Sequence, residues 1–122
     1  MPKQIAFLTL GCAKNEVDSA QMQEDLVCAG FEIVDIESSY DALVINTCAF
    51  IQPAIEESID TILDAAALES ISTGKTKLIV AGCLPSRFGK ELESELSEVS
   101  AFVPCNEEDF LVEVLFSLIS GR

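Results

Sequence analysis

The sequence predicts an α/β fold with a five-stranded parallel sheet and helices on both faces. Short apolar runs alternate along the chain with amphipathic segments, which is typical of repeated strand–helix units. The 122 residues fit one domain of ordinary size, and no linker, repeat or low-complexity stretch interrupts them. We therefore expect residues 1–122 to form a single domain.

The first half of the chain contains three expected strands. Residues 5–10 read as a buried strand, residues 31–36 alternate as a half-buried strand does, and residues 42–47 form a third apolar run. Between the first two, Asn15 is suited to cap a helix that ends at Gly30.

A second helix is expected after residue 52, because Pro53 suits a first helical turn. Its apolar positions follow helical spacing: Ile55, Ile59, Ile62, Leu63, Ala66 and Ala67. A loop over Ser70–Thr76 then leads to a fourth strand over Lys77–Gly82.

The last third predicts a helix, a short strand and a final helix. The first helix has one apolar face (Phe88, Leu92, Leu96, Val99), and the strand covers Ala101–Val103. Asn106 is suited to cap the final helix, whose expected buried stripe is Phe110, Leu111, Val114, Leu115, Leu118 and Ile119. Right-handed crossovers between five such strands most simply give the flavodoxin-like order 2-1-3-4-5.

The acidic charge of the chain favours basic partners over nucleic acid. Seven basic and 21 acidic residues give a formal net charge of −14, which repels phosphate backbones and attracts basic partners. We expect no direct nucleic-acid binding by this domain. No stretch approaches the roughly 20 apolar residues of a membrane span, and the N-terminus lacks the apolar region of a signal peptide. We expect a cytoplasmic protein with no membrane association.

Five cysteines and no histidine are present. In a reducing cytosol, cysteines in a short chain are typically ligands, nucleophiles or core residues rather than disulfides. The absence of histidine removes the usual partner of cysteine in zinc sites and leaves a closed zinc site without a fourth ligand.

Three cysteines follow predicted strands directly. Cys12 comes after the first strand, Cys48 after the third and Cys83 after the fourth. In the order 2-1-3-4-5 these strands are neighbours, so the three thiols are expected at one carboxyl edge of the sheet, where such folds bind ligands. Three converging thiolates favour an iron–sulfur cluster with one iron left open to a further ligand.

The alternative for each cysteine is that of a small buried hydrophobic residue. Cys28, in the last turn of the first helix, is expected to fill the core in this way. Cys105 follows the fifth strand at the same edge as the three proposed ligands and could lie near them. Gly11 and Gly82, each just before a cysteine, would let the backbone approach a cluster closely.

Three segments resemble the ordered motifs of the N-terminal domain of radical-SAM methylthiotransferases. They are residues 10–19 (LGCAKNEVDS), residues 46–51 (NTCAFI) with the following EESI of residues 56–59, and residues 81–87 (AGCLPSR). The resemblance spans essentially the whole chain. It implies that Cys12, Cys48 and Cys83 bind an auxiliary 4Fe–4S cluster whose open iron carries the sulfur or methylthio group to be inserted.

The same resemblance implies that this chain is one part of a longer enzyme. In the family, a Cys-x-x-x-Cys-x-x-Cys motif holds a second 4Fe–4S cluster that cleaves S-adenosylmethionine, and that spacing is absent from residues 1–122. We therefore expect the radical-SAM and C-terminal domains to lie outside this chain, which by itself is not catalytically complete.

Details of the motifs indicate the substrate branch. Lys14-Asn15, Val17-Asp18-Ser19 and the segment 56–59 look most like the branch that methylthiolates an aspartate of small-subunit ribosomal protein S-twelve. A basic ribosomal protein also suits an acidic domain. Two alternatives stay open: a methylthiotransferase that modifies a tRNA adenosine, and a non-catalytic flavodoxin-like interaction module with incidental cysteines.

Overall fold

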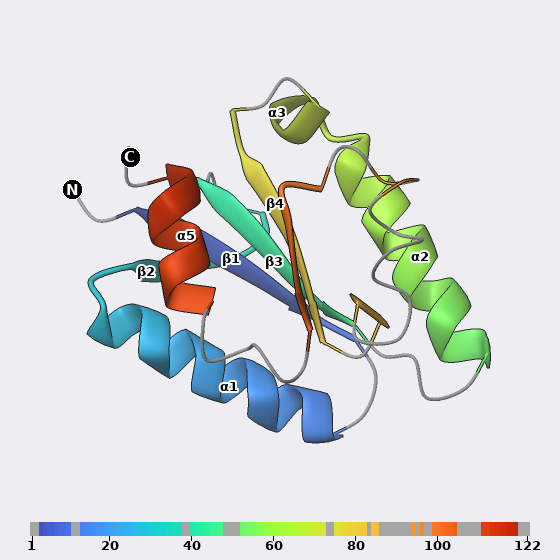
Figure 1. Ribbon diagram of the computed structural model, residues 1–122, viewed down its shortest axis with the longest axis horizontal. Helices are drawn as coiled ribbons and strands as arrows, with labels where there is room; N and C mark the ends of the chain where they lie inside the picture. Colours follow the sequence, from blue (N-terminus) through green and yellow to red (C-terminus); the bar gives the residue numbers. More distant parts are fainter. Residues whose placement is uncertain are drawn as a thin grey trace.

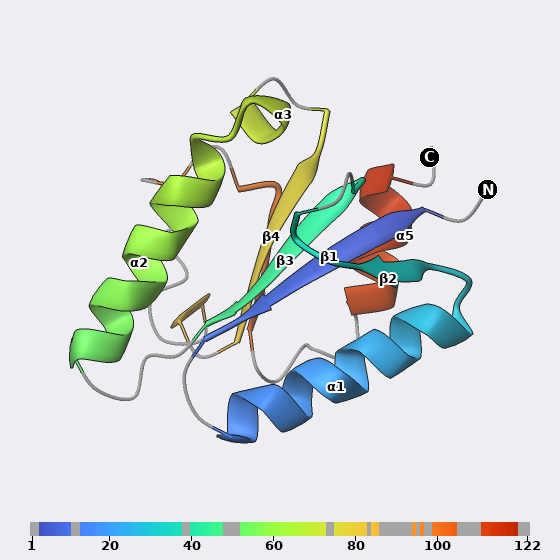
Figure 2. The ribbon, with the colours of Figure 1, turned by 180° about the vertical axis from the view of Figure 1, so that it is seen from behind.

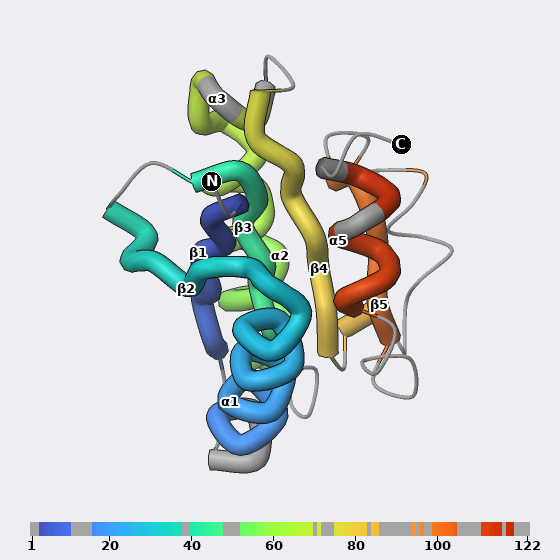
Figure 3. Tube along the Cα trace, turned by 90° about the vertical axis from the view of Figure 1, so that its left-hand side faces the viewer, coloured from blue at the N-terminus to red at the C-terminus, as the bar shows by residue number. Residues whose placement is uncertain are grey.

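The computed structural model describes residues 3–10, 13–37, 40–47, 52–72, 75–82, 84–85, 94, 96, 99–104 and 111–119. Its sheet has five strands: β1 (Gln4–Thr9), β2 (Glu32–Val34), β3 (Ala42–Thr47), β4 (Lys77–Gly82) and β5 (Ala101–Pro104). Their order is β2-β1-β3-β4-β5 and every neighbouring pair is parallel. Figure 3 shows β1, β3, β4 and β5 following one another from left to right. The predicted fold class and strand order are confirmed.

The central strands are apolar because both faces of the sheet are covered. Every residue of β3 is buried, and so is every residue of β4 after Lys77. Helices α1 (Ala13–Cys28) and α5 (Leu111–Ile119) lie on one face, whereas α2 (Gln52–Ala66) and the short α3 (Glu69–Ser72) lie on the other (Figures 1 and 2).

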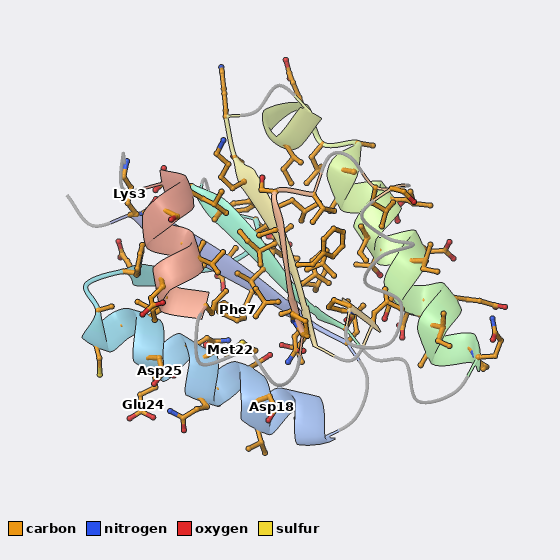
Figure 4. All side chains as sticks on the ribbon, viewed as in Figure 1. Lys3, Phe7, Asp18, Met22, Glu24 and Asp25 are labelled. Atoms are coloured by element: carbon orange, nitrogen blue, oxygen red, sulfur yellow. The ribbon has the colours of Figure 1, made fainter. Side chains whose placement is uncertain are left out.

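Each face of the sheet has its own hydrophobic core. The α1/α5 side includes Ile5, Met22, Leu26, Val44, Ile79, Leu111 and Leu115. The α2 side includes Leu43, Ile45, Ile62, Leu78, Val80, Leu84 and Leu96. In Figure 4, Phe7 and Met22 lie between α1 and the sheet, while Glu24 projects away from it. The strands alternate their side chains between these two cores, so the sheet is held from both sides.

Helix α1 ends at Cys28, two residues before the predicted end at Gly30. Gly30 adopts a φ of 105°, the Gly30 N–H donates to Val27 O (3.1 Å), and the Phe31 N–H donates to Leu26 O (3.0 Å). These two bonds form a Schellman motif, and the buried side chains of Phe31 and Leu26 accompany it. The start differs: α1 begins at Ala13, so Asn15 lies inside the helix and the predicted cap at Asn15 is wrong.

Two further expectations are corrected. The segment Ser70–Thr76 is not wholly a loop, because α3 extends through Ser72. Leu63 of α2 (49% exposed) and Ala67, which directly follows the helix, are exposed. The buried stripe of α2 runs instead through Ile55, Ser58, Ile62, Ala65 and Ala66. The predictions made on Phe88, Leu92, Asn106 and Phe110 lie outside the described residues.

The helices that the structure describes are too short or too polar for a membrane, and none of them qualifies as a candidate membrane span.

Two adjacent residues of α2 test the packing of this face. Ile62 is fully buried and Leu63 is 49% exposed. Ile62→Ala should lower the free energy of unfolding by about 2–5 kcal/mol, because it removes buried methyl groups and leaves a cavity. Leu63→Ala should change it by no more than about 0.5 kcal/mol. Urea denaturation of both variants measures the difference, and equal losses would show that α2 is rotated relative to the described structure.

Candidate functional site

The carboxyl ends of β1, β3 and β4 meet at one edge of the sheet. Thr9 of β1 pairs with Asn46 of β3, and Thr47 of β3 pairs with Gly82 of β4. The Leu10 N–H donates to Asn46 O at 2.9 Å, so the chain still runs beside β3 one residue after β1 ends. Residues that directly follow these strands therefore start from neighbouring positions.

The predicted ligands Cys12, Cys48 and Cys83, like Cys105 and Gly11, lie outside the described residues. In the sequence, Cys48 is bonded to Thr47, and Cys83 stands between Gly82 and Leu84. Cys12 comes two residues after Leu10. The described part of the chain contains no group of three or more residues able to hold a metal ion. The candidate site is thus defined by the residues that flank the cysteines.

Cys28 is the one cysteine within the described ranges. It occupies the last position of α1, as predicted, and its thiol is free and exposed. The expectation that Cys28 fills the core is wrong, because the buried face of α1 passes through Met22 and Leu26.

A threonine hydroxyl joins the ends of β3 and β4. Thr47 is fully buried; its Oγ1 donates to Ala81 O at 2.6 Å and accepts from the Leu84 N–H at 3.2 Å. The two partners stand on either side of Cys83 in the chain. One side chain of β3 thereby holds the backbone before and after the predicted ligand that follows β4 in the sequence.

A network of three polar side chains joins β1, α1 and β3. Asn46 Nδ2 donates to Ser19 Oγ at 2.9 Å, and Ser19 Oγ shares a hydrogen bond of 2.7 Å with Thr9 Oγ1. Asn46 and Ser19 are buried and Thr9 is partly buried. Buried polar groups cost free energy unless they are hydrogen-bonded, so these contacts fix α1 against the strand ends.

Gly82 is required by the backbone at this edge. Its φ is 101°, a region that residues with a Cβ rarely adopt. A Cβ at this position would lie 2.5 Å from Asn46 Oδ1 and 2.6 Å from Thr47 O. Gly82 therefore has a role within the sheet, because the missing Cβ lets β4 pass close to β3. This role is separate from the one expected near a cluster.

Sequence reasoning missed the four polar residues Thr9, Ser19, Asn46 and Thr47 as a group. A signal was available, because Thr9, Asn46 and Thr47 are polar residues at the carboxyl ends of strands whose central residues are apolar. Polar side chains at the end of a buried strand need partners, and those partners gather at the carboxyl edge.

Two hollows among the described residues lie beside β2 rather than at the ends of β3 and β4. One, of about 460 Å³, is lined mainly by residues 33–37 with Phe7 and Gln23. The other, of about 360 Å³, lies between Tyr40, Leu8 and α2. Burial raises the pKa of the Tyr40 phenol above its ordinary value, so this hydroxyl stays protonated near neutral pH.

Comparisons with known proteins place this architecture in context. The model of the uncharacterized protein family UPF0004 matches residues 4–104. Among solved structures, the adenylate cyclase from Rhodopirellula baltica aligns with a TM-score of 0.54 at 11% identity and covers 98% of this chain and 94% of the cyclase chain. At that identity the likeness concerns the fold alone.

Similar sequences carry the name ribosomal protein uS12 methylthiotransferase RimO. The protein from Solibacter usitatus is 45% identical over 91% of this chain and 24% of its own length. The one from Natranaerobius thermophilus is 40% identical over 98% of this chain and 27% of its own. The protein from Myxococcus xanthus is 46% identical over 84% of this chain and 21% of its own length. The chain therefore spans about a quarter of the length of these relatives.

Two glycines with positive φ allow a matched test of the β3–β4 edge. Gly82→Ala should lower the free energy of unfolding by roughly 2–5 kcal/mol, because the new Cβ is both strained and blocked by β3. Gly30→Ala has nothing within 4 Å of the new Cβ and carries only the strain of its φ, about 1–2 kcal/mol. Thermal or urea unfolding ranks the two, and an equal or smaller loss for Gly82→Ala would contradict the close approach described here.

Proposed function

This chain belongs to the uncharacterized protein family UPF0004, and we propose that it is the auxiliary-cluster domain of a methylthiotransferase, with Cys12, Cys48 and Cys83 holding a 4Fe–4S cluster. The carrying observation is the common edge of β1, β3 and β4, whose last residues pair in register. Each proposed ligand follows one of these three strand ends within three residues.

The donor set suits the proposed cluster. Cysteine sulfur is the normal ligand of a 4Fe–4S cluster, and such a cluster takes four ligands. Three cysteines would therefore leave one iron open to a sulfur donor. When bound, the cluster would supply that open iron as the place where the sulfur to be transferred is held.

The chain's own contribution is to place the ligands and keep them together. The buried bonds of Thr47 and Ser19 join the strand ends from which the three cysteines continue. The fully buried Leu84, next to Cys83, anchors the chain in the core on the α2 side. These contacts are between protein atoms, and in this proposal they hold the strand ends together before a cluster is loaded.

The radical chemistry belongs elsewhere in the proposal. The sequence holds no Cys-x-x-x-Cys-x-x-Cys spacing, and the relatives are about four times longer than this chain. We assign S-adenosylmethionine and the second 4Fe–4S cluster to a radical-SAM domain of the same enzyme. In this proposal residues 1–122 contribute the auxiliary-cluster part of that enzyme.

The proposed substrate is an aspartate of ribosomal protein uS12, in keeping with the names of the relatives. Charge supports a basic protein partner rather than nucleic acid. Helix α2 exposes Glu56, Glu57, Asp60 and Asp64 and contains no lysine or arginine. With a net charge of −14, the domain attracts a cationic protein and repels phosphate. A ribosomal substrate also places the enzyme in the cytoplasm.

The cysteine assignment is tested by iron content. After anaerobic reconstitution with iron and sulfide, the 122-residue chain should hold about four irons and four sulfides. Cys12→Ala, Cys48→Ala and Cys83→Ala should each lose most of this iron. The exposed Cys28→Ala is the matched control and should keep it. Iron retained by the Cys83 variant and lost by the Cys28 variant would refute the ligand set.

The substrate assignment is tested in cells that lack the gene. Mass spectrometry should show uS12 without its methylthio group, while methylthiolated tRNA adenosines stay at wild-type levels. Complementation with the wild-type gene should restore the modification and serves as the control. Loss of the tRNA modification with uS12 still modified would instead establish the tRNA alternative.

A further inference from the structure

We propose that Thr47 is a positioning residue of the cluster site, which fixes the chain around Cys83 before any metal is bound. This inference rests on the proposed cluster-binding function and deepens it. Its basis is one hydroxyl group that bonds to the backbone on both sides of a ligand while its own residue precedes another ligand, Cys48.

The ladder between β3 and β4 ends at the pair Thr47 and Gly82. The hydroxyl of Thr47 donates to Ala81 O, inside the ladder, at 2.6 Å. It also accepts from the Leu84 N–H, beyond the last pair, at 3.2 Å. Leu84 is fully buried on the α2 side of the sheet. The main chain that enters and leaves Cys83 is therefore tied to β3.

Position 47 needs a side chain that both donates and accepts a hydrogen bond in a fixed direction, and threonine provides this. A hydroxyl group can donate one hydrogen bond and accept two. The Thr47 hydroxyl uses its donor toward Ala81 O and one acceptor position toward the Leu84 N–H. The β-branch restricts the side-chain torsion and so directs the hydroxyl. Valine has nearly the same shape and no hydroxyl, whereas serine keeps the hydroxyl and lacks the methyl group. The pair of substitutions separates the hydrogen bonds from the packing.

The expected consequence is on how firmly the cluster is held. Groups that orient metal ligands change metal affinity by about 10–100-fold when they are removed. Without the Thr47 hydroxyl, the chain around Cys83 would have to be ordered when the cluster binds, and that cost would weaken its hold. Thr47 does not need to touch the cluster for this effect.

Thr76 provides the matched control. It is also a buried threonine whose hydroxyl donates to a backbone carbonyl, Tyr40 O at 3.2 Å. It stands just before β4 begins, at the opposite end of the strand from Cys83. A general loss of stability from a missing buried hydroxyl would affect the Thr47 and Thr76 variants alike, whereas a positioning role would not.

The experiment compares wild type, Thr47→Val, Thr47→Ser and Thr76→Val as the reconstituted 122-residue chain. The rate of iron release to an excess of a ferrous chelator is followed without oxygen, and hydrogen exchange of the Leu84 amide is measured in the metal-free chain. Thr47→Val should release iron about 10–100-fold faster than wild type. Thr47→Ser and Thr76→Val should stay within about threefold of it, and only Thr47→Val should expose the Leu84 amide.

Each outcome decides one claim. If wild type holds the cluster and Thr47→Val releases iron no faster than Thr76→Val, the positioning role is wrong and the cluster site stands. If wild type binds no cluster, the proposed function fails and this inference with it. Should Thr47→Val not fold, exchange in metal-free wild type decides: a Leu84 amide as slow as those of β4 supports the role, and one as fast as exposed amides overturns it.

Discussion

Parallel pairing of β1, β3 and β4 is the constraint on which the rest of this structure depends. Parallel strands end at the same edge of the sheet. Segments that are far apart in the sequence therefore leave the sheet from neighbouring positions. The pairing also buries the central strands between two helical layers, which is why the middle of β3 and of β4 is a continuous apolar run. Against this background, the polar residues at the strand ends mark the edge where the chain changes from core to site.

Those polar residues give the edge its definition. Ser19 joins α1 to Thr9 and Asn46, and Thr47 joins β3 to the chain around Cys83. Inside a protein such bonds are strong when complete and costly when broken, so they select one arrangement of the strand ends. Gly82 adds a steric condition, since only a residue without a Cβ allows β4 to approach β3 this closely. An arrangement selected in this way lowers the ordering cost that a bound metal would otherwise have to offset.

Much of this fold could be predicted from the sequence, and the failures have physical causes. The bounds of β3 and β4 were correct because continuous apolar runs of strand length leave little choice. The predicted start of α1 is wrong. Asparagine is a favoured N-cap residue, but the helix already begins at Ala13, so Asn15 lies inside it. Leu63 and Cys28 are apolar in character but exposed, since the rotation of a helix is set by packing. The network at the edge joins residues between 10 and 37 positions apart, which local patterns do not reveal. The strand ends of the proposed site were predictable, because topology alone brings them together.

We propose that the edge formed by β1, β3 and β4 presents three cysteines to a single cluster. The most direct test of this proposal is anomalous diffraction at the iron absorption edge from crystals of the anaerobically reconstituted chain. We expect one compact iron peak beyond the carboxyl ends of these strands, with density continuing to the sulfur atoms of Cys12, Cys48 and Cys83. Iron bound through Cys28 or Cys105, or iron at the hollows beside β2, would contradict it.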